Sequence, residues 1–132
     1  MFNMINKKGF TLLEIVIVVI IIGILASLAI PNFGKIKENA LDKEAISNLK
    51  LIQVAEKGYY YDMGSYYPSS GSASTIANIN SNLKLSLTTK NWIYEVWSTG
   101  CGRATRNVTG GRSWYLTITD LAGDPVAGAL CP

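Results

Sequence analysis

The chain has 132 residues, of which 48% are hydrophobic and 16% charged, and its formal net charge is +3. It contains no histidine and only two cysteines, which excludes histidine-based acid/base catalysis and leaves too few ligands for a cysteine/histidine zinc site. Twelve basic against nine acidic residues are too close to balance to indicate nucleic-acid binding.

An apolar segment near the N-terminus has the length of a membrane span. Phe10 to Ile30 contains 21 residues, which as a helix measure about 30 Å, the thickness of a bilayer core. Lys7 and Lys8 precede it, and the first nine residues contain no acidic side chain. This charge bias predicts a membrane-spanning helix whose N-terminus stays in the cytoplasm.

Glu14 is the one charged residue inside this segment. A carboxylate in a hydrocarbon-facing helix is costly unless it is paired, so it is a functional candidate. A secretory signal peptide would explain the basic start and the small residues at Ser27 and Ala29, but its apolar core is shorter, roughly 7 to 15 residues. Neither that interpretation nor a plain single-pass anchor accounts for Glu14.

Two further features of the segment affect helix packing. Gly23 and Ser27 form a small-xxx-small pair, which allows apolar helices to approach closely. Pro31 lacks a backbone donor and clashes with the preceding turn. It predicts either a kink or the exit of the helix from the membrane.

Beyond Pro31 the helical pattern continues with an amphipathic period. Apolar residues recur at spacings of three, four or seven with charged residues between them; they are Phe33, Ile36, Ala40, Leu41, Ala45, Ile52, Ala55 and Tyr59. We expect a helix to about Tyr61 whose apolar face packs on a domain. A rod from Phe10 to Tyr61 would measure roughly 78 Å.

Residues 58–82 have the composition of a loop. Asp62-Met63-Gly64-Ser65, Pro68 and the Ser/Gly run that follows are turn-forming. Five tyrosines lie in or beside this stretch, and we expect them to pack on the core rather than serve surface stacking, adhesion or electron transport; they are Tyr59, Tyr60, Tyr61, Tyr66 and Tyr67.

The C-terminal third has the alternation of antiparallel strands. Asn91–Trp97 and Ser113–Thr119 each place apolar residues on one face. Arg103–Thr109 followed by Gly110-Gly111 predicts a tight hairpin with a primed turn, leading into a strand at Arg112. Cys101 and Cys131 predict a disulfide around a loop of about 30 residues, worth roughly 3 to 4 kcal/mol.

Three weaker signals remain in this region. Arg103, Arg106 and Arg112 favour a solvated strand face or an acidic patch on a neighbouring molecule over DNA. Asn107-Val108-Thr109 matches a glycosylation triplet. Asp120 and Asp124 are two carboxylates, which fall short of a calcium shell without backbone oxygens. Because the residue types for acid/base or nucleophilic work are missing or unplaced, we expect no enzyme and no cofactor.

The residues from Lys8 to Glu14, followed by an apolar segment that ends at Ala29-Ile30-Pro31, resemble the prepilin signature of type IV pilins and pseudopilins. The resemblance covers about the first 35 residues. It implies that a membrane prepilin peptidase cleaves after Gly9 and methylates the new amine of Phe10, although Gly9 could also be a flexible joint before a helix. It further implies that Glu14 pairs with the amine of a neighbouring subunit in a helical filament, and that the helix unwinds between Gly23 and Pro31 on assembly.

The fold expected from this resemblance is α+β, a long N-terminal helix packed on a three- or four-stranded antiparallel sheet. The expected regions are a leader at 1–9, an assembly half of the helix at 10–31, an amphipathic half at 32–61 and a disulfide-closed head at 62–132. The resemblance favours a major type IV pilin, a homo-oligomer serving adhesion, motility or DNA uptake. Its partners would be prepilin peptidase, the inner-membrane assembly machinery and the membrane.

Two alternatives remain open for the protein as a whole. One is a pseudopilin that forms a short periplasmic filament of the type II secretion system. The other is a secreted soluble binding protein with a cleaved signal peptide.

Overall fold

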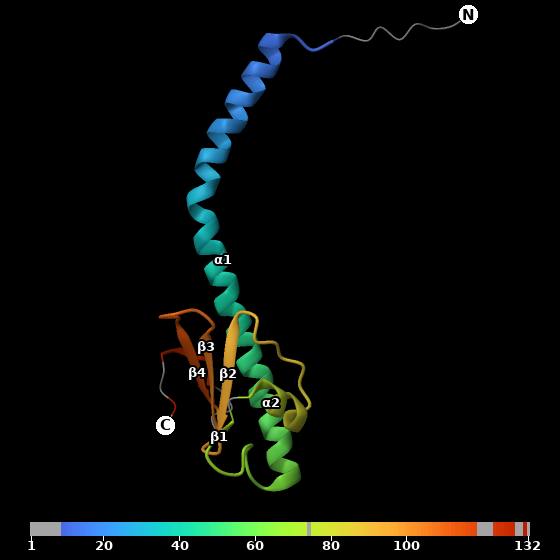
Figure 1. Cartoon of the computed structure of the whole chain (residues 1–132), viewed down its shortest axis with the longest axis vertical. Helices are drawn as coiled ribbons and strands as arrows, with labels where there is room; N and C mark the ends of the chain where they lie inside the picture. The colour runs from blue at the N-terminus through green and yellow to red at the C-terminus, as the bar shows by residue number, and fades with distance from the viewer. Residues whose placement is uncertain (1–8, 74, 119–122, 129–130, 132) are drawn as a thin grey trace, which may run out of the picture. The chain divides into compact units, whose positions relative to one another are not determined.

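The computed structural model describes residues 9–73, 75–118, 123–128 and 131. The chain divides between Asn39 and Ala40 into two compact units. We refer to the second unit as the head. Helix α1, Leu12–Met63, begins in the first unit and ends in the head (Figure 1).

Helix α1 ends at a glycine. Gly64 has a positive φ of 75°, a left-handed conformation that glycine adopts without a Cβ penalty. Its backbone N–H donates to the Tyr60 carbonyl oxygen at 2.8 Å, as in the common glycine cap of helix C-termini. The turn chemistry around Gly64 therefore stops the helix two residues beyond the predicted end at Tyr61.

The head contains a second helix and a five-stranded antiparallel sheet. Helix α2 spans Ile76–Leu83. The strands follow one another in the sheet in chain order; they are β1 (Ser72–Ala73), β2 (Trp92–Trp97), β3 (Cys101–Arg106), β4 (Ser113–Thr117) and β5 (Val126–Ala127). Three long central strands are thus flanked by two very short ones. The α+β class is confirmed, but the predicted three or four strands are too few, because the two-residue strands β1 and β5 carry too short a pattern to be recognised in the sequence.

One face of the sheet packs against the part of α1 that lies in the head. On α1 the buried positions are Ala45, Leu49, Ile52, Gln53 and Glu56, whose spacings place them on one face of the helix. On β2 every second residue is buried, as predicted; these residues are Trp92, Tyr94 and Val96. On β3 the buried residues are Cys101, Gly102 and Ala104, and on β4 Leu116 is buried while Trp114, predicted on the same face, is half-buried against the core.

Gly102 allows the helix to lie close to the sheet. It pairs with Val96 on one side and Leu116 on the other, so it sits in the centre of the inner face. A Cβ built there would lie 3.5 Å from Leu49 Cδ2, which leaves room for a methyl group but not for a larger side chain.

Polar contacts join the part of α1 at the start of the head, around residues 41 and 42, to the sheet. The Trp92 Nε1–H donates to the Leu41 carbonyl oxygen at 3.0 Å, and the Trp114 Nε1–H donates to Asp42 Oδ1 at 3.4 Å. Arg112 forms an ion pair with the second Asp42 oxygen at 3.0 Å. Asp42 therefore fixes β4 and the loop before it to α1.

Replacing Asp42 with alanine is expected to destabilise the head by about 2 kcal/mol, because the variant leaves a tryptophan N–H and a guanidinium without their acceptor. Denaturant unfolding followed by tryptophan fluorescence measures the change. Asp62→Ala, at an exposed position of the same helix, is the control, and it should change stability by less than about 0.5 kcal/mol. Equal stabilities for the two variants would contradict this role of Asp42.

The structure corrects the loop predicted at 58–82. Helix α1 continues through Gly58 to Met63, β1 lies inside this stretch, and α2 begins inside it at Ile76 and ends one residue beyond it at Leu83. Helix α2 buries Ile79 and Leu83 on one face. Its asparagine- and serine-rich sequence hides that apolar spacing, and packing on the core outweighs the poor helix propensity of those residues.

The predicted tight hairpin is also wrong. Strands β3 and β4 are joined by residues 107–112, in which the Gly111 N–H donates to the Val108 carbonyl oxygen at 3.0 Å. Gly110 has φ of 70° at the third position of this turn, as a type II turn requires. A Cβ on Gly111 would lie 2.5 Å from Arg106 Cβ, so the two glycines serve a longer turn.

Candidate functional site

The residues of the predicted cleavage site lie at the start of the described chain. Gly9 and Phe10 precede α1 outside any helix or strand, and both are exposed; Phe10 keeps 79% of its surface accessible. A Cβ on Gly9 would meet no atom within 4 Å. Gly9 therefore has no packing role in this structure, and the peptide bond after it is accessible.

Glu14 lies in the first turn of α1 and forms a reciprocal capping arrangement with Thr11. The Thr11 hydroxyl oxygen accepts a hydrogen bond from the Glu14 backbone N–H at 3.3 Å. The Glu14 carboxylate accepts one from the Thr11 backbone N–H at 3.5 Å. This is the capping box of a Thr-x-x-Glu sequence, which satisfies two N–H groups that the first helical turn leaves free. Glu14 thus has a local partner within its own chain.

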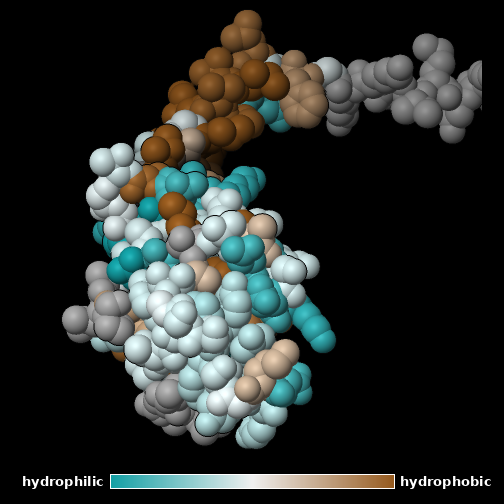
Figure 2. Space-filling view, turned by 60° about the horizontal axis from the view of Figure 1, so that its bottom comes forward, coloured by the Kyte–Doolittle hydropathy of each residue, from teal (hydrophilic) through white to brown (hydrophobic). Residues whose placement is uncertain are grey.

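The segment that follows Glu14 is exposed and apolar along its whole length. Leu12–Ile30 is the one helical segment among the described residues that is long and apolar enough to cross a membrane. None of this segment is buried among the described residues; Leu28, for example, is 68% exposed. Figure 2 shows these hydrophobic residues gathered on the helical segment that leads to the N-terminus. Such a surface requires a lipid or protein environment.

Gly23, Ser27 and Pro31 all lie within continuous α-helix. A Cβ on Gly23 would meet no atom within 4 Å, and the Ser27 hydroxyl donates to the Ile24 carbonyl oxygen at 2.7 Å. The helix neither ends at Pro31 nor unwinds between Gly23 and Pro31 in this single chain. Their roles in assembly stay predictions.

A second exposed apolar surface follows the outer side of α1 in the head. Ser47, Leu51, Val54, Gly58 and Tyr61 are spaced by four, three, four and three residues and so share one helix face. Leu51, Val54 and Tyr61 are 50%, 67% and 87% exposed. We call these five residues the outer stripe. The outer stripe is not among the features predicted from the sequence, for which a single apolar face was expected on this helix.

The predicted inner face is partly wrong for the same reason. Phe33, Ile36 and Ala40 were expected to pack on a domain, but all three are exposed. Leu49 and Glu56, which were not predicted to be buried, occupy the inner face instead. Their spacing from Ala45 and Ile52 was the signal that could have identified them.

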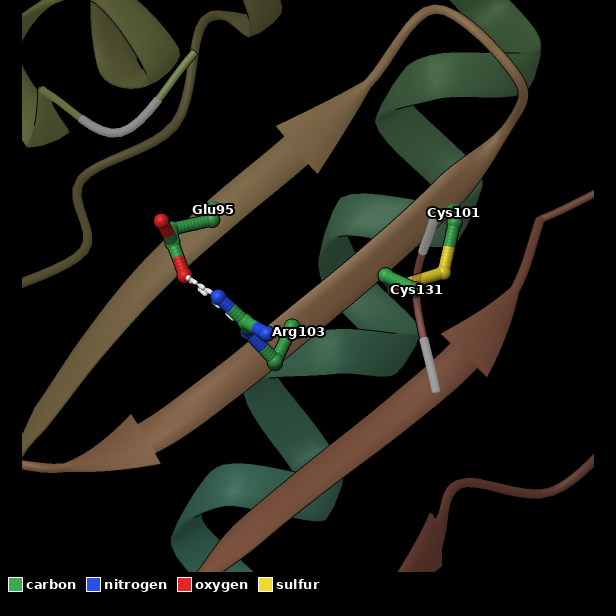
Figure 3. The surroundings of a disulfide bond; sticks show 4 residues. All are labelled: Glu95, Cys101, Arg103 and Cys131. Atoms are coloured by element: carbon green, nitrogen blue, oxygen red, sulfur yellow. Dashed lines mark hydrogen bonds and ion pairs between the residues drawn. A yellow bond between two sulfur atoms is a disulfide. The ribbon is translucent and has the colours of Figure 1, made fainter. Parts of the chain in front are cut away.

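The face of the sheet away from α1 bears an ion pair and the disulfide (Figure 3). Arg103 on β3 binds Glu95 on β2 through Nε at 3.0 Å and also through a terminal nitrogen. Its guanidinium lies 4.9 Å from the centre of the Trp97 ring. Cys101 at the start of β3 is bonded to Cys131, with Cα atoms 6.0 Å apart. The disulfide attaches the C-terminal end of the chain to the sheet.

Each of the three arginines of this region contacts a residue of its own chain. Arg103 pairs with Glu95, and Arg112 with Asp42. The Arg106 guanidinium lies 5.6 Å from the centre of the Trp92 ring. These contacts lie within the head, and the Arg112 side chain remains 54% exposed. The expected acidic patch on a neighbouring molecule stays a prediction.

The other weak signals are placed as follows. Asp120 lies outside the described residues, while Asp124 Oδ1 lies 2.6 Å from Lys50 Nζ. Asn107 is exposed, and its amide donates to the Thr89 carbonyl oxygen at 3.1 Å. Of the tyrosines, Tyr59, Tyr66 and Tyr67 pack against the core as predicted, whereas Tyr60 and Tyr61 are exposed.

Comparison with known proteins agrees with the motif at the N-terminus. Residues 4–30 match the family model described as the prokaryotic N-terminal methylation motif. The chain is 48% identical over 61 residues to the type IV major pilin protein PilA of Myxococcus xanthus, an alignment that covers 46% of this chain and 28% of that protein.

Similar alignments are found with components of a secretion system. Identity to the type II secretion system core protein G is 43% over 63 residues for Escherichia coli and 41% over 63 residues for Vibrio cholerae. These alignments cover 48% of this chain in both cases, and 43% and 42% of the relatives. The chain therefore spans less than half the length of the curated relatives it matches.

Proposed function

We propose that this chain, whose N-terminal part is similar to a type IV major pilin and to type II secretion core proteins, is a structural subunit of an extracellular type IV pilus filament. The precursor is held in the inner membrane by the apolar part of α1 and is cleaved between Gly9 and Phe10. The new amine of Phe10 is methylated by prepilin peptidase. Subunits then polymerise through this helix with the help of the inner-membrane assembly machinery, and the protein has no enzymatic role.

The observation that supports this proposal most is the position of Glu14. It stands in the first turn of a helix whose next 16 residues are uncharged and exposed. Cleavage after Gly9 would place a positive amine four residues before it, and methylation of an amine keeps its charge. Both charges are costly in an apolar environment, and pairing between subunits offsets part of that cost.

The geometry of the first helical turn favours a partner from another subunit. The carboxylate of Glu14 reaches back to the Thr11 N–H of its own chain at 3.5 Å, a long hydrogen bond, and each carboxylate oxygen has two lone pairs. The group can therefore keep its capping contact and accept an additional donor. We propose that Phe10 of the next subunit supplies this donor, and that Gly23 and Pro31 allow the helices to approach.

The outer stripe supports a filament rather than a membrane anchor alone. An anchor requires only the apolar segment up to Ile30, yet Leu51, Val54 and Tyr61 expose apolar surface on the head's helix as well. In a filament made of one kind of subunit this surface can be covered by other copies. The partner proposed here is accordingly a homo-oligomer, which serves adhesion, motility or DNA uptake.

A second candidate is a pseudopilin of the type II secretion system, located in a periplasmic pseudopilus. It is favoured by the alignments with core protein G, which cover more of the relatives' length than the alignment with PilA does. The disulfide between Cys101 and Cys131 is the feature of this head that favours the pilus. A secreted protein with a cleaved signal peptide is the third candidate, and Glu14 opposes it.

Filaments sheared from the surface of cells are expected to consist mainly of this chain, with methylated Phe10 as the first residue. Mass spectrometry of the sheared fraction and of its N-terminal peptide measures both. The same N-terminus found only in the cell envelope would favour the pseudopilus. A mature chain that starts at Ile30, after the small residues of the signal-peptide interpretation, would contradict both filament proposals.

A further inference from the structure

A carboxylate is buried in the core of the head. Glu56 lies on the inner face of α1, one turn beyond Ile52, and has no exposed surface. Its Oε2 accepts a hydrogen bond from the Tyr67 backbone N–H at 2.8 Å. Its Oε1 is buried and has no hydrogen-bond partner among the described residues. Burial with a single hydrogen-bond donor is unfavourable for the ionised form of the carboxylate, and it therefore favours the protonated, neutral form.

Tyr67, whose backbone N–H binds Glu56, belongs to the connection between α1 and β1, residues 64–71. Glycines with positive φ lie at both ends of this connection, Gly64 at 75° and Gly71 at 71°. Between them Tyr67 packs its ring edge-on against Tyr59, with centroids 5.7 Å apart. Glu56 therefore ties the middle of a segment whose two ends can change conformation with little steric cost.

The connection leads directly into β1 at the edge of the sheet. Ser72 and Ala73 pair with Trp97 and Val96 of β2, and the Ser98 N–H donates to the Gly71 carbonyl oxygen at 3.0 Å. Movement of the connection would disturb these short pairings and expose the backbone of β2.

We propose that Glu56 is a proton-dependent contact that controls whether the connection 64–71, and β1 after it, stay closed over the head. With a proton on Glu56, the buried side chain is neutral and the contact to Tyr67 is retained. Without it, hydration of the carboxylate favours an open connection in which water reaches Glu56.

Burial has a larger effect on the pKa of Glu56 than the polar groups around it. Burial raises the pKa of Glu56 to about 7, while the Tyr67 N–H lowers it by a smaller amount. The titratable side chains in the core or packed against it are Tyr59 on α1, Tyr66 and Tyr67 on the connection and Tyr94 on β2, and the sequences of α2 and β1 contain none. The charged residues of β2 and β3 are Glu95, Arg103 and Arg106; none of them is among the causes of the Glu56 pKa shift. The charged residues of α1 nearest in sequence are Lys57, Lys50 and Asp62, and none of them is among the causes of this shift.

The direction of the pH dependence follows from the raised pKa. In the open state Glu56 is solvated and titrates near its ordinary value of 4.5, whereas in the closed state it titrates near 7. Below pH 4.5 both states bind the proton, so the closed state has its full stability. Between pH 4.5 and 7 the open state releases the proton first, so opening becomes more favourable as the pH rises. Above pH 7 the effect is constant.

Hydrogen exchange on the full-length chain in detergent micelles tests the proposal. After correction for intrinsic rates, the opening equilibrium of residues 65–73 should increase on the order of 50- to 100-fold from pH 5 to pH 8. The Glu56→Gln variant should lose this dependence, and Asp62→Asn, on the same helix, should retain it. A change of less than about threefold in the wild-type chain would overturn the proposal.

Two further readouts separate a local contact from a general effect on folding. Hydrogen exchange of the central strand β3 should change much less with pH than exchange of residues 65–73. An equal change in both would mean that the whole head unfolds, and it would overturn the proposal. Carbon NMR of the Glu56 carboxyl in the wild-type chain reads its titration without any variant. A midpoint near 4.5 would overturn the proposal even if Glu56→Gln failed to fold. None of these outcomes depends on whether the chain forms a pilus or a pseudopilus.

Discussion

Glu14→Gln is expected to be processed normally after Gly9 but to form at least 100-fold fewer filaments than the wild type. Removing one partner from a buried ion pair costs about 3 to 5 kcal/mol, which is more than two orders of magnitude in the affinity between subunits. The yield of sheared filaments and the length of the mature chain, both by mass spectrometry, measure assembly and processing separately.

The capping box makes the choice of substitution important. Glutamine at the third helical position can still accept from the Thr11 N–H, so Glu14→Gln removes the charge and keeps the cap. Thr11→Val is the matched control, because it removes the hydroxyl that accepts from the Glu14 N–H and leaves the carboxylate in place. If the charge drives assembly, Thr11→Val forms filaments and Glu14→Gln does not. The reverse result would assign Glu14 to helix capping and contradict the proposed pairing.

Removing the disulfide is expected to have the largest effect on the stability of the head. Cys101 and Cys131 enclose a loop with a sequence separation of 30, for which the chain-entropy model gives about 3 to 4 kcal/mol. The double variant Cys101→Ser, Cys131→Ser should lose this amount in denaturant unfolding, and β5 inside the loop should become less protected from hydrogen exchange. Using the double variant avoids a single free thiol that could form intermolecular disulfides.

The local nature of the effect provides the control for that experiment. Exchange of β2 and α2, which lie outside the enclosed loop, should change only with the global stability. The wild-type chain under reducing conditions should behave as the double variant does. A double variant as stable as the oxidised wild type would show that contacts such as the one between Lys50 and Asp124, at 2.6 Å, fix this segment without the covalent bond.

The features predicted correctly from the sequence are those with a strong and simple period. The uncharged run after Glu14 could only be a long apolar helix, and the alternation Trp92, Tyr94, Val96 placed β2 and its buried face correctly. The count of two cysteines left one intrachain pairing, which the structure contains. In each case a single sequence feature, namely hydrophobicity, alternation or cysteine count, was sufficient to predict the structure.

The predictions failed where tertiary packing decides between weak local preferences. Helix α2 consists mainly of asparagine, serine and alanine around Ile79 and Leu83. These residues have little helix preference of their own, and the helix forms because Ile79 and Leu83 pack into the core. Gly110 and Gly111 suit a primed two-residue turn equally well, and only the approach of Arg106 shows why both are needed. The burial of Glu56 was missed because a carboxylate is assigned to the surface by default.

The outer stripe has a practical consequence for work with the isolated head. Deleting the apolar segment before Ala40 would remove the membrane requirement but leave Leu51, Val54 and Tyr61 facing water. A truncated protein of this kind is expected to self-associate at the concentrations used for crystallisation or NMR. Val54→Lys, at a position 67% exposed, should improve its solubility while leaving the buried side of the helix untouched.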